Sequence, residues 1–268
     1  MPFIKLLIIS QVLSPYVQSM KTLYSIIPAL TSLLLACGGN NRDSNVESPG
    51  EEKTAKTKTL EAGATLLQDK TPVSKLNMYL DGFHFYNGDM QGQMEAHHYC
   101  TKLNEDVTQC IMYDGNTENA KIMGIEYIIS ERLFKTLPME ERKYWHSHAY
   151  EVKSGELIAP GIPEIAEHEL MEEIVSTYGK LFHTWHTDKD LELPLGTPML
   201  MMGFTADGQI KDSLVAERDF TFGISTAEKR KNRKDIPQPA IVEGANAWEK
   251  GEVLQLEVTK KPVKHHHK

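Results

Sequence analysis

Short strand-like segments, separated by helices at irregular intervals, most constrain what this chain can fold into. Apolar and polar side chains alternate over residues 77–85 and again over residues 107–113, the pattern of half-buried strands. Residues 120–129 follow an Asp114-Gly115-Asn116 turn and are the expected hairpin partner of 107–113. Because strands and helices do not alternate regularly, we expect an α+β fold, with a single globular domain built on a mixed, mainly antiparallel sheet flanked by helices.

Further elements are predicted from caps, breakers and apolar runs. Ser130 can cap a helix that reaches Leu137, and Pro138 can begin the next helix. The other predicted elements are a loop over 88–93, a hairpin over 151–158, a helix over 163–178, strands over 181–186, 198–204 and 253–258, and a helix from Ser225 to Lys234.

Residues 1–37 have the layout of a secretory signal peptide. Lys21 precedes an apolar run of about a dozen residues, too short to span a bilayer comfortably. Leu34-Leu35-Ala36-Cys37 resembles the bacterial lipobox, so we expect lipidation of Cys37 and a true start at Met20. The alternative is a plain signal peptide or short anchor that happens to contain a cysteine.

The same segment predicts the compartment and the domain boundaries. Gly38-Gly39 follows Cys37 without an aspartate that would signal inner-membrane retention. By resemblance to Gram-negative lipoproteins, we expect a lipid-anchored protein of the bacterial cell envelope. The outer membrane is favoured over the inner membrane. Residues 38–75 are rich in Ser, Thr, Lys and Glu and lack aromatic residues, which predicts a flexible, disordered tether. The domain is expected over 76–260 and a disordered tail over 261–268.

The net charge bears on the partners. The chain carries a formal charge of −8 at pH 7, whereas nucleic-acid binding requires a basic surface. We therefore expect no nucleic-acid partner. The expected partners are the membrane, through lipidated Cys37, and a lipid or an envelope protein. The basic run from Lys229 to Lys234 is interpreted as a solvated helix face, with contact to anionic lipid head groups as the alternative.

Several blocks resemble the oil-body-associated protein family, over about Asn77 to Val258. These blocks are His97–Cys100, Leu103–Val107, Gln109-Cys110, Glu126–Ser130, Leu193–Gly196, Ile224–Thr226 and, the longest, Trp145 to Gly155. Members are plant seed proteins with bacterial and fungal relatives, otherwise described as a domain of unknown function. The resemblance implies a link to lipid-droplet stability and no established enzymatic mechanism. The exported, lipidated front end departs from the plant members, so the oil-body role does not carry over directly.

His146 and His148 are the first candidates for metal ligands. If residues 146–148 are extended, both imidazoles point to one face, about 7 Å apart at Cβ, and can approach one ion. Zinc or iron would be the expected metal. Further ligands are sought among His97, His98, Cys100, Glu151 and His183. The alternative is that the imidazoles form hydrogen bonds with Tyr150, Trp145 and backbone carbonyls inside the core.

Cys100 and Cys110 remain after Cys37 is lipidated. An oxidising envelope would permit a disulfide between them. The family resemblance implies otherwise, since plant members that look cytosolic carry cysteines at the matching positions. We therefore predict buried, inert thiols.

Two functions follow from these observations. The first is a membrane-anchored envelope lipoprotein, non-enzymatic, whose domain binds lipid or a partner. The second is a metal-dependent, hydrolase-like enzyme that uses His146, His148 and one of His97 or His98.

Overall fold

The computed structural model describes residues 41–189 and 191–261. The predicted signal peptide with its lipobox and Cys37 lies outside these residues, as do Met20 and residues 262–268 of the predicted tail. Among the helices of the described part, none combines the length and apolar character that crossing a bilayer requires.

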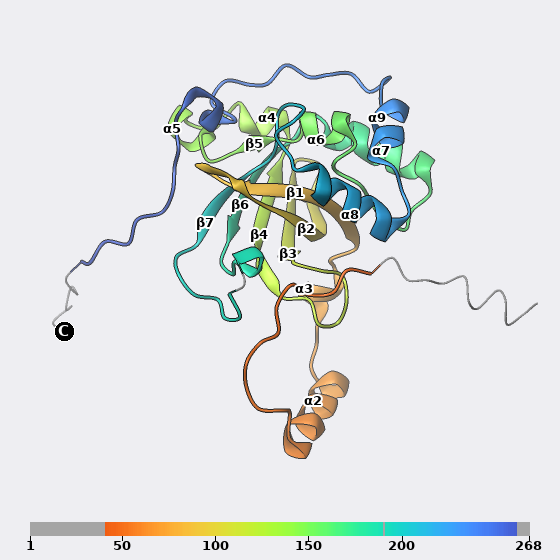
Figure 1. Cartoon of the computed structure of the whole chain (residues 1–268), viewed down its shortest axis with the longest axis vertical. Coiled ribbons are helices and arrows are strands. Elements are labelled where there is room, and N and C mark those ends of the chain that lie inside the picture. The colour runs from red at the N-terminus through yellow and green to blue at the C-terminus, as the bar shows by residue number, and fades with distance from the viewer. Residues whose placement is uncertain (1–40, 190, 262–268) are drawn as a thin grey trace, which may run out of the picture. The chain divides into compact units, whose positions relative to one another are not determined.

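The described residues form a 7-stranded sheet in the order β4-β3-β2-β1-β7-β6-β5 (Figure 1). An additional pairing of β4 with β6 closes the sheet into a barrel, and β5 pairs only with the start of β6. Every pairing between these strands is antiparallel, which confirms the predicted α+β class with its antiparallel sheet. The strands are β1 (Met78–Tyr86), β2 (Asp89–Asn104), β3 (Val107–Tyr113), β4 (Ile122–Ile129), β5 (His146–Ser147), β6 (Tyr178–His183) and β7 (Met199–Met202).

Short helices accompany the barrel. Figure 1 shows α4 to α7 and α9 at one end of the strands, with α8 beside β1 and β2. The predicted caps are confirmed, because Ser130 Oγ accepts from Leu133 N in α4 and Ser225 Oγ accepts from Glu228 N in α9. The α-helices are α2 (Ala55–Leu67), α3 (Thr71–Ser74), α4 (Glu131–Phe134), α5 (Met139–Arg142), α6 (Ala149–Ser154), α7 (Glu164–Ile174), α8 (Asp212–Phe222) and α9 (Thr226–Asn232), with 3₁₀ turns η1 (Thr187–Lys189) and η2 (Ala247–Lys250).

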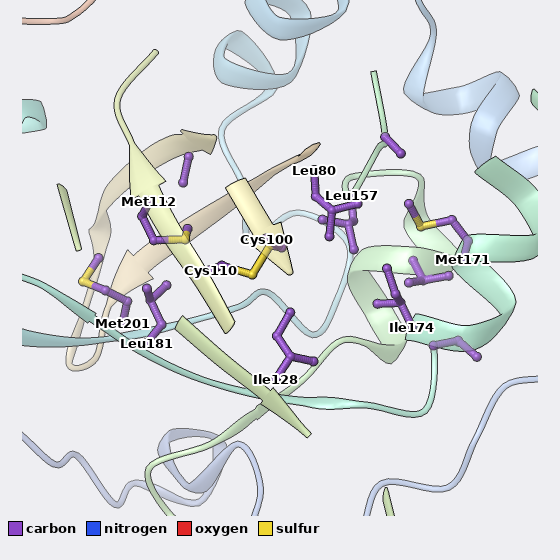
Figure 2. Packing of buried hydrophobic residues seen from close by; sticks show 14 of the residues in the cluster. Leu80, Cys100, Cys110, Met112, Ile128, Leu157, Met171, Ile174, Leu181 and Met201 are labelled. Atoms are coloured by element: carbon purple, nitrogen blue, oxygen red, sulfur yellow. A yellow bond between two sulfur atoms is a disulfide. The ribbon is translucent and has the colours of Figure 1, made fainter. Parts of the chain in front are cut away.

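Strand alternation divides the core into an inner and an outer layer. The inner layer includes Leu80, Met112, Leu181 and Met201, joined by Ile174 of α7 (Figure 2). Aromatic residues dominate the outer layer, where Phe83, Phe85 and Phe204 pack with Trp248 of η2 and with α8 side chains. Apolar side chains therefore cover the inner and the outer face of the strands. A polar group buried among them needs an internal partner.

A disulfide joins Cys100 of β2 to Cys110 of β3, so the prediction of free thiols is wrong (Figure 2). Both cysteines are buried, as predicted. The antiparallel register places them directly opposite each other, with their Cα atoms 4.0 Å apart. Their separation of ten residues did not reveal this register in the sequence. Cys100 is thereby removed from the candidate metal ligands.

Four local predictions are wrong for identifiable reasons. Residues 151–158 begin in α6, which ends at Gly155 in the left-handed region, and so form no hairpin. The helix over 163–178 ends at Ile174, because Tyr178 already begins β6. The loop over 88–93 is the start of β2. Residues 253–258 form no strand, because the Gln255 side chain, not the backbone, bonds to the main chain of Leu200.

The described part of the predicted tether carries α2, which has no buried residue, and a segment that contacts the barrel. Ser44 Oγ donates to Asp114 Oδ2 at 2.8 Å, and the Arg42 guanidinium lies 3.9 Å from Glu95 Oε2. Val46 is buried. The chain thus meets the barrel before residues 55–67 form α2.

Candidate metal centre

Five histidines and two glutamates meet in the barrel interior, and we call them the His/Glu cluster. All are buried, at most 4% exposed, although they come from six different elements or their caps. The members are His84 of β1, His98 of β2, Glu126 of β4, His146 of β5, His148 at the N-cap of α6, Glu151 of α6 and His183 of β6.

The backbone around His146 and His148 differs from the extended segment that was predicted. Only His146 and Ser147 are in β5, and His148 is helical (φ −79°, ψ 0°) as the N-cap of α6. The two rings nevertheless converge, with centroids 5.0 Å apart. Asn246 fixes this bend from outside, because Ser147 N donates to its side-chain oxygen and its own N–H donates to Trp145 O.

Glu126 is the centre of the cluster. Its Oε1 lies 3.4 Å from His146 Nε2 and 3.3 Å from His148 Nε2, while its Oε2 lies 3.5 Å from His98 Nε2. Strand β4 directs this carboxylate inward by the period-2 alternation of its side chains, on the same face as Gly124 and the buried Ile128. Both carboxylate oxygens therefore face imidazole nitrogens.

Hydrogen bonds outside the cluster fix which nitrogens face inward. The Thr177 hydroxyl gives its proton to Ile174 O, so it can only accept from His148 Nδ1, 2.8 Å away. His98 Nδ1 lies 3.0 Å from Ala96 O, a carbonyl that can only accept. In a neutral ring each Nε2 then carries a lone pair, and in both residues that lone pair faces the Glu126 carboxylate.

Burial and mutual contacts shift the ionisation of the cluster. Burial alone would raise the pKa of Glu126, but His148, His98 and His146 lower it to about 2, so the group is ionised at neutral pH. Burial, together with the neighbouring His148, lowers the pKa of His146 to about 3. Burial also lowers the pKa of His183 to about 3 and that of His84 well below its ordinary value. The interior thus combines an ionised carboxylate with buried imidazoles, and at His146, His183 and His84 burial favours the neutral ring.

Several buried polar atoms of the cluster have no hydrogen-bond partner among the described residues. They include both ring nitrogens of His146 and of His183, His84 Nδ1 and Glu126 Oε2. Buried polar groups in folded proteins are nearly always paired, so such a concentration requires an explanation. Donor atoms of His84, Glu126 and His146 lie within 4.8 Å of one another, as do those of His146, His148 and Glu151. Such sets can surround a metal ion.

His97, predicted as a possible ligand, lies on the other face of β2 and outside the cluster. Its Nδ1 contacts the Tyr79 hydroxyl at 2.7 Å and Asp81 Oδ2 at 3.1 Å, beneath Arg218 of α8. Adjacent residues on a strand point to opposite faces, so only one of His97 and His98 could enter the barrel. His98, Glu151 and His183 lie where the metal prediction needs them.

Sequence reasoning missed His84 and Glu126. His84 occupies a position of β1 in phase with Leu80, and Glu126 is the one acidic residue of β4, between Ile125 and Tyr127. A carboxylate inside an otherwise apolar strand is the signal that could have identified Glu126, because burying an unpaired charge is costly.

The fold and the cluster together define a class: a closed antiparallel barrel with a histidine- and glutamate-lined interior. The chain belongs to the oil body-associated protein family. A family model described as "Protein of unknown function (DUF1264)" matches residues 70–237. The family resemblance of the sequence is thus confirmed.

The similar relatives are plant proteins. Oil body-associated protein 1B of Arabidopsis thaliana is 43% identical over 218 residues, which cover 80% of this chain and 90% of the relative. Oil body-associated protein 1A of Zea mays is 43% identical over 209 residues, 77% of this chain and 88% of the relative. Oil body-associated protein 2C of Arabidopsis thaliana is 37% identical over 222 residues, which cover 81% of this chain and 94% of the relative. No solved structure shows a significant match.

Proposed function

We propose that this protein is a metal-binding barrel that holds a zinc or iron ion at Glu126, His146 and His148. The observation that carries the proposal is the convergence of ligand atoms: the Nε2 atoms of His148 and His146 lie 3.3 and 3.4 Å from Glu126 Oε1, inside the closed barrel. Ligand atoms at these separations leave room for one ion about 2.0–2.1 Å from each of them. A divalent ion would occupy that space and satisfy the unpaired His146 Nε2 as well.

The donor chemistry fits such an ion. Imidazole nitrogens with one or two carboxylate oxygens suit zinc and iron, and Glu151 Oε2, 4.0 Å from His148 Nε2, can add a second carboxylate. Metal-bound histidines usually donate the other ring N–H to an oxygen, as His148 does to Thr177. The orientation of the ring is therefore supported from outside the cluster.

The burial of the cluster limits what the ion can do. Catalysis by a hydrolase-like centre needs a coordination position that substrate and water can reach. Since the cluster residues are at most 4% exposed, their burial favours an enclosed ion that stabilises the barrel, or one that acts on a very small molecule. Metal binding is the proposal, and hydrolysis of a large substrate is disfavoured.

Metal analysis of the purified full chain tests this proposal. Because His265–His267 can bind metal adventitiously, all samples carry alanine at these positions. After loading with zinc or iron(II) and dialysis, we expect stoichiometric metal, and its loss in His146→Ala and His148→Ala. The control is His168→Ala, a histidine outside the cluster. A wild-type chain that keeps its fold, by circular dichroism, and retains neither metal would overturn the proposal.

We further propose that lipidated Cys37 anchors the chain in a bacterial cell envelope. The outer membrane is favoured over the inner membrane. The support is the order of Lys21, the apolar run and Leu34-Leu35-Ala36-Cys37. The relatives are named for association with oil bodies. In this chain, we propose that the domain contacts a lipid or an envelope protein instead.

The basic run is a poor lipid contact. Arg233 and Lys229 both pair with Glu167 of α7, and Arg230 pairs with Asp207. These charges are offset within the barrel domain, and no residue of α9 is buried, which favours the interpretation of this run as a solvated helix face. Lipid association is therefore proposed through Cys37 and not through this helix.

Metabolic labelling with a palmitate analogue in a Gram-negative host tests the anchor. We expect label and membrane fractionation for the wild type and neither for Cys37→Ala. The matched control, Cys100→Ser with Cys110→Ser, should keep the label. An unlabelled wild-type chain in the soluble fraction would contradict the anchor.

A further inference from the structure

We propose that the His/Glu cluster holds two metal ions, bridged by the Glu126 carboxylate. The inference rests on the proposed metal binding and adds a second ion position on the Oε2 side of Glu126. His98, His84 and His183 would supply its imidazole ligands. The first position keeps His146 and His148 on the Oε1 side.

The two oxygens of Glu126 face different histidines. Oε1 faces the Nε2 atoms of His146 and His148, at 3.4 and 3.3 Å. Oε2 faces His98 Nε2 at 3.5 Å and has no hydrogen-bond partner in the described structure. A carboxylate with separate imidazole partners on each oxygen has the arrangement of a bridge between two ions.

Two pairs of histidine rings have centroids about 5 Å apart, and His84 also lies 5.6 Å from His146 of the other pair. Two imidazoles bound to one tetrahedral ion at the usual metal–nitrogen distance have ring centroids about 5 Å apart. His146 and His148 are 5.0 Å apart, and His84 and His98 are 5.1 Å apart. Each pair has the spacing that one ion requires. His146 and His148 lie at Oε1 of Glu126. His98 lies at Oε2, and His84 lies beside His98.

One ion leaves part of the cluster unexplained. An ion held by His146, His148, Glu126 and Glu151 already has four ligands, the usual number for zinc. His183 would still have two unpaired buried nitrogens and His84 one. The His84 and His183 ring centroids are 6.3 Å apart, within reach of a shared ion at a wide ligand–metal–ligand angle. A second ion would pair His84 Nδ1 and one of the two His183 nitrogens.

Charge and spacing are compatible with two ions. Bridged ions in two-metal sites lie about 3.5–4 Å apart, a separation that one carboxylate spans. Glu126 and Glu151 offset half of the charge of two divalent ions, and a hydroxide between the ions would offset more. The cluster thus resembles a two-metal centre in donor number and in arrangement.

The other buried acidic group is a poorer cation site. Asp81, Glu95 and His97 also have donor atoms within 4.8 Å of one another. Arg218 lies 3.1 Å from Asp81 Oδ1, however, and Arg42 lies 3.9 Å from Glu95. Two guanidinium groups already balance these two carboxylates. The second ion therefore belongs in the barrel interior.

Titration of the metal-free full chain, with alanine at His265–His267, tests the inference. Manganese(II) is added in steps, and bound ions are counted after gel filtration. We expect two ions per chain. Electron paramagnetic resonance should show a spin-coupled pair, because a bridging carboxylate couples adjacent ions. These readouts use the wild-type fold and do not depend on any variant.

Paired variants locate the second ion. His98→Ala should bind one ion and lose the coupled signal, whereas His97→Ala, its neighbour on the opposite face of β2, should keep two ions and the coupling. One uncoupled ion in the wild type would overturn the second position and leave the proposed metal binding intact. Absence of bound manganese, together with absence of bound zinc in a parallel titration, would overturn both.

Discussion

His148 Nε2 lies 3.3 Å from Glu126 Oε1, although the two residues are 22 positions apart and belong to different elements. His148 follows β5, which pairs with the start of β6, and Glu126 lies in β4, which pairs with β6 from the other side. The contact therefore spans the β4–β6 pairing that closes the barrel. Formation of the site and closure of the barrel depend on each other.

Removing the Thr177 hydroxyl should weaken metal binding without changing a ligand. In Thr177→Val, His148 Nδ1 loses its acceptor, so the ring is no longer held with Nε2 toward Glu126. Loss of such a supporting hydrogen bond costs about 10–100-fold in metal affinity. Competition with a chromogenic chelator measures the change. Thr221→Val is the control, since that hydroxyl also donates to a helix carbonyl, far from the cluster. Equal affinities for Thr177→Val and wild type would contradict the assigned orientation.

Gly179 should not tolerate a side chain. An alanine Cβ there would lie 2.0 Å from Glu126 Oε1 and 2.8 Å from His148 Nε2. We expect Gly179→Ala to lose metal and to lower the free energy of unfolding by at least about 1–3 kcal/mol, as overpacked cores do. Urea unfolding measures this loss. Gly63→Ala, where a Cβ meets no atom within 4 Å, is the control and should be neutral or stabilising. A Gly179→Ala chain as stable as wild type would show that the cluster is not packed as described.

Reduction of the Cys100–Cys110 disulfide should destabilise the barrel. Closing a short loop in the unfolded chain contributes about 2–4 kcal/mol in the chain-entropy account. Replacing both cysteines with alanine should therefore lower the urea midpoint, and a thiol reductant should lower the midpoint of the wild type but not of the variant. Quantitative alkylation of both cysteines in the unreduced, unfolded wild type would show that the bond does not form.

Glu156 should make stability decrease as the pH rises. Burial is the main cause that raises the pKa of this carboxyl, to about 7 from an ordinary 4.5. Between these values the unfolded chain has lost the proton that the folded chain retains, so the contribution to stability is full below about pH 4.5 and is lost by about pH 7. Glu156→Gln should thus stabilise the protein more at pH 8 than at pH 5.

Thermal unfolding at both pH values measures this difference. Glu169→Gln, at an exposed glutamate of α7, provides the comparison. An equal effect of Glu156→Gln at pH 5 and pH 8 would mean that Glu156 is ionised throughout.

Local patterns predicted those parts of the fold that depend on neighbouring residues. Alternation located β1 and β3, the turn after β3 located β4, and the capping serines Ser130 and Ser225 located two helix starts. The closure of the barrel depends on pairing between β4 and β6, which lie far apart in the chain, and no local pattern specifies it. The Cys100–Cys110 register could not be predicted for the same reason.

The candidate site was predicted in part. His146 and His148 were identified as a pair from their spacing, but the geometry assumed an extended backbone, and the structure reaches the same convergence through the start of α6. Choosing His98 over His97 required the register of β2, which only the pairing with β1 and β3 determines. Glu126 could be identified as the centre of the His/Glu cluster only from the structure, in which β4 lies near β5 and the start of α6.

Anomalous diffraction from crystals of the zinc-loaded protein is the most direct test of the central claim. At the zinc edge, we predict a peak inside the barrel, about 2.0–2.2 Å from His146 Nε2, His148 Nε2 and a Glu126 oxygen. A barrel interior without anomalous density in fully loaded crystals, with His148 Nε2 still facing Glu126, would contradict the claim that this cluster binds metal.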